Sequence, residues 1–349
     1  MKKFIISIVL IPAFFCLSIN CCYLYKQSSK FIYYNLNAKP VSSLVNKDNV
    51  SDSLKNFFKI VNQICKYAQD TIGLKKNNNF TKYVSLSKSY LLDIISACEK
   101  TSFKPYKWCY PFFGCWPLRG YYEEKDAIKE ETRLKKLDYD VFRTKSDAFS
   151  TLGIFSDPLY SFMKNYSEFR LANLIIHEQT HSTIYIKNQV EFSEALACFI
   201  AQEGALGFIK HKYQDTSKQY LQAEDFIKDI KTYDKIIKEL YERLLKLYES
   251  NTTKEQKIIK KKEIIYNFVD SINANYDSIF ILKKYWMLDK NLINNAYLYL
   301  EKTYTYDLDL FYKLYEKQDK NLKTTLITIK NLTKNKGDIK ELIKKIIEK

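Results

Sequence analysis

The chain has 349 residues, an apolar fraction of 46% and a formal net charge of +16. This length and apolar content exclude a disordered chain and suit one large domain or two modest ones. The charge alone could indicate nucleic acid, but the basic excess is spread along the chain, and arginine, the side chain best suited to reading bases, is scarce. We therefore expect no nucleic-acid partner.

Residues 1–21 have the pattern of a signal peptide. Two lysines precede an almost unbroken apolar run from Phe4 to Phe15, which is short for a membrane span. Two cysteines follow, as in a relaxed lipobox, and we predict lipid attachment at Cys21, with Cys22 as the second choice. The alternatives are an ordinary signal peptide or an uncleaved anchor. Each version places the protein in the cell envelope, outside the cytoplasm, and the first ties it to a membrane by a lipid anchor.

Residues 51–100 have apolar residues at helical intervals. In the first predicted helix these are Leu54, Phe57, Phe58, Val61, Ile64 and Cys65. Asp52 or Ser53 is its predicted N-cap. A second helix is predicted through Leu91, Leu92, Ile94 and Ile95, ending before Pro105.

The middle of the chain is rich in proline and glycine, which predicts loops and short strands. Residues 139–142 and 148–155 have strand-like alternation with β-branched and aromatic side chains. We expect a small sheet here, packed against the helices that follow.

The cysteines are interpreted from the predicted location, since disulfides persist outside the cytoplasm. Cys109 and Cys115 flank a proline- and glycine-containing turn, so a local disulfide is predicted. Cys65 and Cys98 could also pair, but nothing local favours it. Cys198 lies in an apolar helical run and is interpreted as a small buried hydrophobe.

From Ser167 the pattern returns to helix and contains His177-Glu178-Gln179-Thr180-His181. This is H-E-x-x-H, the signature of zinc peptidases. On a helix, positions i and i+4 share a face, so both imidazoles can bind one Zn²⁺. Glu178 lies beside them as the candidate general base. His211, the only other histidine, lies in a basic, exposed-looking string and is judged a surface residue.

A catalytic zinc site needs a third protein ligand and one open position. Glu194 is the best candidate, because it lies at the predicted start of a second helix that can fold back on the first across residues 187–191. Glu203 could hydrogen-bond a ligand histidine, or be an exposed carboxylate. Tyr185 and Tyr304 are candidate donors to the oxyanion of the tetrahedral intermediate, and packing is the alternative role for each.

Arg119 is one of few arginines in a lysine-rich chain, so a forked donor could be required there, for a substrate carboxylate or a structural one. After Tyr213 the sequence becomes lysine-rich with helical spacing, and residues 251–253 are its clearest break. Residues 339–349 are predicted to form an amphipathic helix, for which a membrane surface is an alternative to packing.

Three blocks of the sequence resemble the predicted-aminopeptidase family of bacterial zinc-dependent lipoproteins, which are gluzincin peptidases. They are residues 176–187 with 192–194, residues 108–121 with 150–158, and Asn294-Asn295-Ala296 with Thr303-Tyr304. The resemblance implies that Glu194 is the third ligand, that Cys109 and Cys115 pair, and that Tyr185, Tyr304 and Asn295 belong to functional motifs. It also implies that residues 150–153 form an edge strand that holds a peptide substrate. Gln179-Thr180 and Ser193 depart from the family pattern.

Together these observations predict an α+β, mainly helical, zincin-like fold with a small sheet on the metal-bearing helices. We expect a signal peptide (1–21), a catalytic region (22–213) and a helical C-terminal region packing on it (214–349). The predicted function is a zinc-dependent peptidase, an aminopeptidase by resemblance, with one Zn²⁺ and a peptide substrate. A carboxylate must then capture the substrate's amine, and Glu191 is conceivable in that role. The alternative is a non-catalytic envelope lipoprotein that binds peptides or acts as a scaffold.

Overall fold

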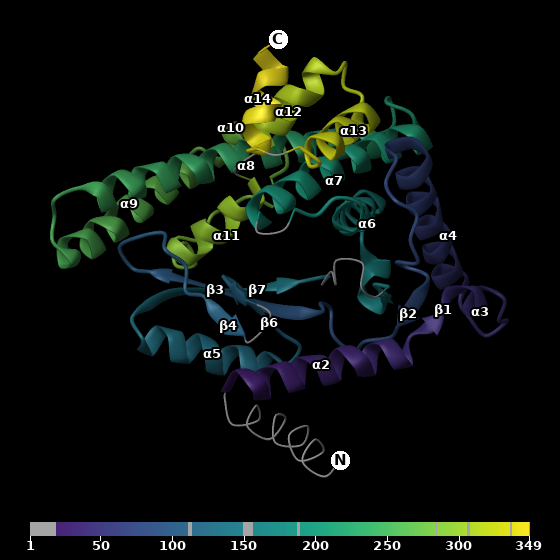
Figure 1. Cartoon of the computed structure of the whole chain (residues 1–349), viewed down its shortest axis with the longest axis horizontal. Coiled ribbons are helices and arrows are strands. Elements are labelled where there is room, and N and C mark those ends of the chain that lie inside the picture. Colours follow the sequence, from purple (N-terminus) through teal and green to yellow (C-terminus); the bar gives the residue numbers. More distant parts are fainter. Residues whose placement is uncertain are drawn as a thin grey trace.

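The computed structural model describes residues 19–110, 114–148, 156–186, 189–283, 285–305, 308–335 and 337–348, with side chains from residue 22. It is mainly helical with small sheets, so the predicted α+β class is confirmed. Figure 1 shows the sheet in the middle of the molecule, with helices below it, above it and along one side. The predicted signal peptide lies almost wholly outside the described residues. The backbone of Cys21 belongs to the first turn of a helix, but its side chain is not among the described parts of the structure.

The described helices are α2 (Ile19–Asn37), α3 (Val41–Val45), α4 (Asp52–Tyr67), the π-helix η1 (Ala68–Ile72), α5 (Glu124–Lys136), the 3₁₀-helix η2 (Ser161–Asn165), α6 (Glu168–Thr183), α7 (Val190–Tyr213), α8 (Lys218–Glu249), α9 (Lys254–Ala274), α10 (Tyr276–Ile279), α11 (Asn295–Thr305), α12 (Leu308–Lys317), α13 (Leu322–Leu332) and α14 (Ile339–Glu348). The strands are β1 (Lys39–Pro40), β2 (Lys82–Val84), β3 (Leu92–Glu99), β4 (Trp108–Tyr110), β5 (Gly114–Trp116), β6 (Leu118–Tyr121), β7 (Tyr139–Ser146) and β8 (Leu159–Tyr160).

The largest described pairing is the antiparallel sheet β6-β3-β7. Its centre is β3, where the sequence predicted a helix, and that prediction is wrong. Most side chains of β3 are buried, on both faces of the strand, so its apolar residues run consecutively instead of alternating. Such a run cannot be told from a buried helix by spacing alone. The strand predicted at 139–142 is confirmed as the start of β7, whereas residues 149–155 lie outside the described residues.

Helix termini follow local capping chemistry. The first predicted helix is confirmed as α4, but its N-cap is Ser51, one residue before the predicted positions, and the Ser51 hydroxyl accepts a hydrogen bond from the amide of Leu54. The predicted break at 251–253 is confirmed, because Thr253 and Gln256 form a capping box that starts α9.

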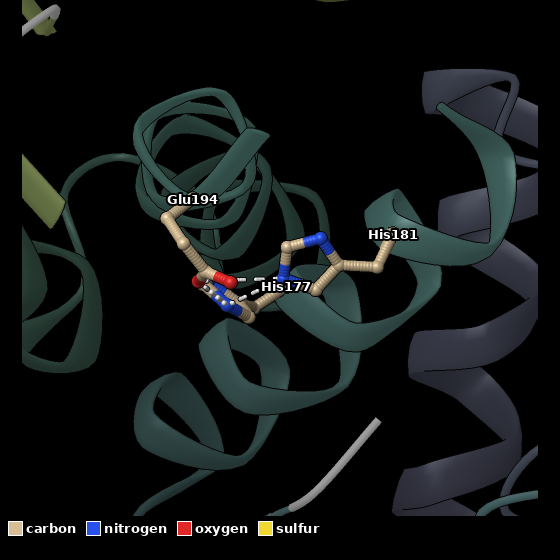
Figure 2. A group of neighbouring side chains, drawn as sticks. All are labelled: His177, His181 and Glu194. Carbon is tan, nitrogen blue, oxygen red and sulfur yellow. Dashed lines mark hydrogen bonds and ion pairs between the residues drawn. The ribbon is translucent and has the colours of Figure 1, made fainter. Parts of the chain in front are cut away.

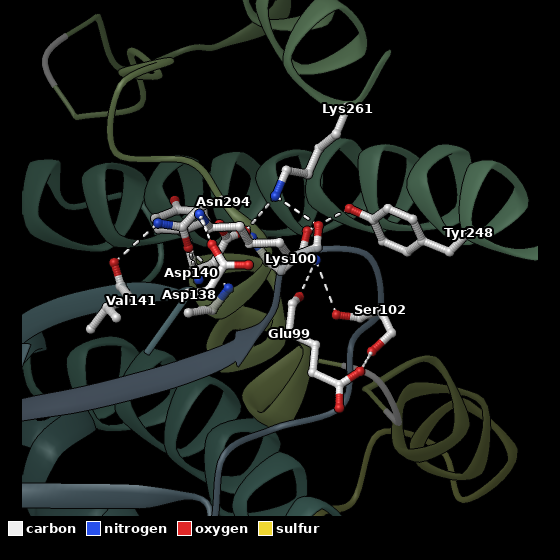
Figure 3. Close-up of polar contacts among 12 residues, drawn as sticks. Glu99, Lys100, Ser102, Asp138, Asp140, Val141, Tyr248, Lys261 and Asn294 are labelled. Carbon is white, nitrogen blue, oxygen red and sulfur yellow. Dashed lines mark hydrogen bonds and ion pairs between the residues drawn. The ribbon is translucent and has the colours of Figure 1, made fainter. Parts of the chain in front are cut away.

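Asn295, a predicted site candidate, belongs to a polar junction that fixes α11 against the sheet. Its buried side-chain amide donates to the carbonyls of Glu99 and Ser102. Nearby, Lys261 of α9 is buried and donates to Asp140 of β7 at 2.7 Å. In Figure 3, Lys261 of α9 meets Asp140 of β7 and the carbonyl of Lys100, just after β3, so this junction joins parts of the chain that are distant in sequence. The structure therefore gives Asn295 an internal partner set and places it in the scaffold.

The main hydrophobic core is built around α7. Side chains of α6 and α7 share it with C-terminal residues such as Phe311, Ile329 and Ile343. The predicted terminal amphipathic helix is α14, and it buries Ile339 and Ile343 in this core. By length and hydropathy α7 could cross a membrane, yet most of it is buried within the protein, as expected for a core helix.

Candidate metal site

The two histidines come from the second half of α6. Ser167 caps this helix through a hydrogen bond accepted from the amide of Arg170, and Ile175 and Ile176 anchor the helix in the core. With one face fixed by burial, the i, i+4 spacing directs His177 and His181 to a common point. His181 is 6% exposed, so its imidazole is almost removed from water.

The third candidate ligand, Glu194, comes from the start of α7. This helix begins at Val190, four residues before the predicted position, so Glu194 lies in its second turn. Ser193, a departure from the family pattern, fixes the connection from α6. Its hydroxyl accepts from the amide of Ile186 at 3.2 Å and donates to the carbonyl of Gln189 at 2.9 Å. The short connection thus places Glu194 beside the histidines.

Three ligand atoms converge between the helices, as Figure 2 shows. The Nε2 atoms of His177 and His181 are 3.1 Å apart. The Oε2 atom of Glu194 lies 3.4 Å from the first and 3.5 Å from the second. Tetrahedral ligands at the usual zinc bond lengths lie about 3.3–3.4 Å from one another. The three donors therefore fit one Zn²⁺, and their chemistry, two imidazoles and one carboxylate, is that of a catalytic zinc site.

The electrostatics of this group keep the carboxylate of Glu194 charged. Burial alone would raise the pKa of Glu194, but hydrogen bonds from His177 and His181 hold the pKa at about 2. Burial lowers the pKa of His181, yet the hydrogen bond and charge of Glu194 outweigh it and raise that pKa overall. The carboxylate thus stays ionised and attracts positive charge to the point where the ligand atoms meet.

Glu178 lies beside the ligands, where the H-E-x-x-H pattern places it. Its side chain is buried, and its Oε2 atom has no hydrogen-bond partner among the described residues. A buried carboxylate oxygen without a donor is costly unless a ligand or water satisfies it. Such an oxygen next to a metal site is available to accept a proton from a bound water.

Two tyrosines predicted as oxyanion donors lie within electrostatic reach of this group. Burial raises the pKa of Tyr185, and the charge of Glu194 raises it further. Burial raises the pKa of Tyr304 on α11 well above its ordinary value, and the charges of Glu194 and Glu178 add to the effect. Both phenols therefore remain protonated donors at neutral pH.

Three other predicted residues have partners away from the histidines. Glu203 pairs with Lys231 of α8 at 3.6 Å. Arg119 is 4% exposed, stacks on the ring of Tyr23 at 3.7 Å and lies 3.7 Å from a carboxylate oxygen of Glu130. The carboxylate facing Arg119 is therefore structural. Asn295 belongs to the junction described above.

The cysteines also have defined places. Cys109 and Cys115 face each other across the β4–β5 hairpin and form a disulfide. Cys65 and Cys98 are free thiols. Sequence reasoning missed a role for Cys198, whose Sγ atom lies 3.9 Å from Nδ1 of His177. Its position four residues after Glu194, on the same face of α7, was the available signal.

A cleft of about 580 Å³ opens next to the start of α7. It is lined by Glu191, one helical turn before Glu194, together with Phe103, Lys104, Pro105, Lys107, Tyr241, Tyr299 and Lys302. An opening of this size can admit a short peptide, and Glu191 connects it along α7 to the candidate ligand Glu194.

The chain matches no curated protein and no solved structure. One family model, described as "Putative aminopeptidase", matches residues 22–342. That span covers nearly the whole chain and includes every candidate ligand. This protein therefore belongs to that family.

Proposed function

We propose that this protein is a zinc-dependent aminopeptidase of the cell envelope with a zincin-like, gluzincin arrangement of ligands. His177, His181 and Glu194 would hold the ion. The observation that carries the proposal is the convergence of their three ligand atoms within 3.1–3.5 Å beside the unpartnered oxygen of Glu178. The family description supports peptide bond hydrolysis as the reaction.

The mechanism follows from the positions of the side chains. When bound, Zn²⁺ lowers the pKa of a water and polarises the scissile carbonyl. Glu178 accepts the proton of the attacking water and transfers it to the leaving amine. Tyr185 or Tyr304 donates a hydrogen bond to the developing oxyanion, because both stay protonated at neutral pH. Low exposure around His181 and Glu178 strengthens each of these interactions.

Aminopeptidase action also requires recognition of the free amine of the substrate. Glu191 lines the cleft one turn before Glu194, which supports it as the carboxylate that captures this amine. The amine would then lie next to the metal, so that only the first peptide bond reaches it.

The decisive experiment combines metal analysis with a peptide library. Protein purified without added zinc should contain close to one equivalent of zinc. Peptides with free amino termini should be cleaved one residue at a time, and their acetylated counterparts should resist. Cleavage of acetylated peptides would show an endopeptidase. Zinc without cleavage of any peptide would favour the peptide-binding scaffold.

The envelope location is a separate part of the proposal and rests on the sequence of residues 1–22. We propose that Cys21 carries the lipid. Metabolic labelling with a fatty acid should mark the wild-type protein and fail for Cys21→Ser. Retained label in that variant, lost only in Cys22→Ser, would move the modified position by one residue.

A further inference from the structure

The first described helix, α2, has a row of exposed apolar side chains. Tyr25, Ile32, Tyr33 and Leu36 are between 54% and 80% exposed. At helical spacing these four positions fall on one face, within a sector of roughly 100°. The opposite side of α2 is held against the core by Tyr34, which is buried. The helix is thus packed on the protein by one side, and its outer face, made of the four exposed residues, is apolar.

The neighbouring helix α5 borders this outer face with positive charge. Figure 1 shows α2 and α5 along the lower edge of the molecule, and two ion pairs join them, Lys26 with Asp126 at 3.0 Å and Lys30 with Glu123 at 2.7 Å. The remaining exposed carboxylate of α5, Glu124, pairs with Arg143 of β7. Three exposed lysines at helical spacing share the side of α5 that faces away from the core: Lys125, Lys129 and Lys136.

An apolar helix face bordered by lysines is typical of a helix that lies in the headgroup region of an anionic bilayer. The place of α2 in the chain favours the same partner. Cys21, the proposed site of the lipid, belongs to the first turn of α2, four residues before Tyr25. Four residues of helix rise about 6 Å, so a bilayer that holds this lipid lies within reach of the outer face. A second copy of the chain would instead bring another set of the same lysines to the contact.

We propose that the outer face of α2, with the three lysines of α5, docks on the surface of an anionic phospholipid bilayer. The inference rests on the envelope location proposed above and adds to it the orientation of the protein on the membrane. In Figure 1 the sheet lies between α2 and α7. A protein docked in this way holds its candidate metal ligands on the far side of the sheet from the lipid.

The test asks whether the outer face of α2 touches lipid in the full chain. A fluorescent amino acid replaces Ser29, which is exposed between Tyr25 and Tyr33 on the same face. The protein is reconstituted into vesicles of phosphatidylcholine and phosphatidylglycerol that contain a nitroxide-labelled lipid. Emission from position 29 should shift to the blue and be quenched by the nitroxide. The same fluorophore in place of Ile259 on α9, which is 60% exposed, should stay unquenched.

Apolar variants assign the contact to the outer face. Ile32→Glu with Leu36→Glu should lower the ratio of docked to undocked protein at least about tenfold, because two apolar groups are replaced by charges that anionic lipid repels. Both side chains are exposed, so the melting temperature should stay that of the wild type. The matched control is Leu221→Glu with Ile327→Glu, on α8 and α13, where both side chains are 48% exposed. It should dock as the wild type does.

Lysine variants test the electrostatic part of the contact. The triple substitution Lys125→Gln, Lys129→Gln and Lys136→Gln should also lower the ratio of docked to undocked protein at least about tenfold. The effect should appear only with vesicles that contain phosphatidylglycerol, and it should weaken as salt concentration rises.

Each result decides the inference. Unquenched emission from position 29, whether or not the protein stays with the vesicles, overturns it, and so does quenching that survives both sets of variants. A blue shift without quenching, together with a dimer in sedimentation, would assign the face to a second copy. Fatty-acid labelling of the same preparation separates the two proposals. Label without lipid contact at position 29 leaves the anchor and removes the docking face, whereas contact without label leaves the docking face and removes the anchor.

Discussion

The Sγ atom of Cys198 lies 3.9 Å from Nδ1 of His177, while the other nitrogen of that imidazole faces Glu194. One turn of α7 therefore contacts both nitrogens of the same ring. Partners of this kind fix the orientation and tautomer of a metal-binding histidine. The thiol is a weak acceptor, so its contribution lies at the low end of what such partners give.

Cys198→Ala is therefore expected to weaken zinc binding about tenfold without abolishing it. Competition with a chromophoric chelator measures this affinity. Cys98→Ala is the matched control, because Cys98 is buried in β3 away from the ligands. It should lower stability but keep the zinc affinity. Equal affinities for wild type and Cys198→Ala would show that the contact has no orienting role.

Glu194→Gln should lose the metal. The substitution keeps the size of the side chain but removes the charge that His177 and His181 face. Elemental analysis should show the zinc content falling from near one equivalent to near zero. Glu203→Gln, on the same helix but paired with Lys231, should retain it. Zinc retained by Glu194→Gln would mean that another group completes the site.

Glu178→Gln should separate metal binding from catalysis. The residue is not a proposed ligand, so zinc content should stay near that of the wild type. Without a proton acceptor, turnover should fall at least 10²-fold. Steady-state hydrolysis of a free-amine peptide, compared with metal content on the same preparation, checks both parts. Unchanged turnover would remove Glu178 from the mechanism.

Gly204→Ala should destabilise the packing that aligns α6 with α7. A Cβ atom at residue 204 would lie 2.7 Å from Cδ1 of Ile72 and 3.2 Å from Ile176, one residue before His177. The clash should cost about 1–3 kcal/mol, more than the roughly 1 kcal/mol that alanine gains in a helix. Chemical denaturation measures the difference. At Gly207 the new Cβ meets only the hydroxyl end of Tyr67, so Gly207→Ala should cost less.

Two buried carboxyls predict a pH-dependent stability. Burial raises the pKa of Glu301 to about 7, and burial with the charge of Glu301 raises that of Asp234 to about 7. Both groups titrate near pH 4 when unfolded. Between about pH 4 and 7 the folded state thus holds more protons, and these groups reduce its stability as pH rises.

The double substitution Asp234→Asn with Glu301→Gln should remove this loss of folding stability with rising pH. Melting temperatures between pH 4.5 and 7.5 should fall less steeply for the variant than for the wild type. Asp225→Asn with Glu239→Gln on α8, whose carboxylates form surface ion pairs, is the control and should follow the wild type. Parallel curves for the wild type and the Asp234, Glu301 variant would contradict the prediction.

Local spacing was enough to find the candidate ligands. Helical periodicity places His177 and His181 on one face, and a short connection limits where Glu194 can lie, so these inferences depend on neighbours in sequence. Features that depend on partners distant in sequence were harder to predict. The strand β3 is defined by pairing with β6 and β7, and the partner of Glu203 comes from α8. No pattern in the sequence close to β3 or to Glu203 predicts those contacts.

The position of α7 also has a consequence for any attempt to divide the protein. Phe199, one residue after Cys198, stacks on Phe311 with ring centroids 5.9 Å apart, and Tyr312 donates to Gln202 at 2.9 Å. Removing the last third of the chain would expose one side of the helix that carries Glu194 to solvent. The C-terminal helices are thus part of the scaffold that holds the ligand set together. A chain cut after α7 would lack the contacts that support this helix.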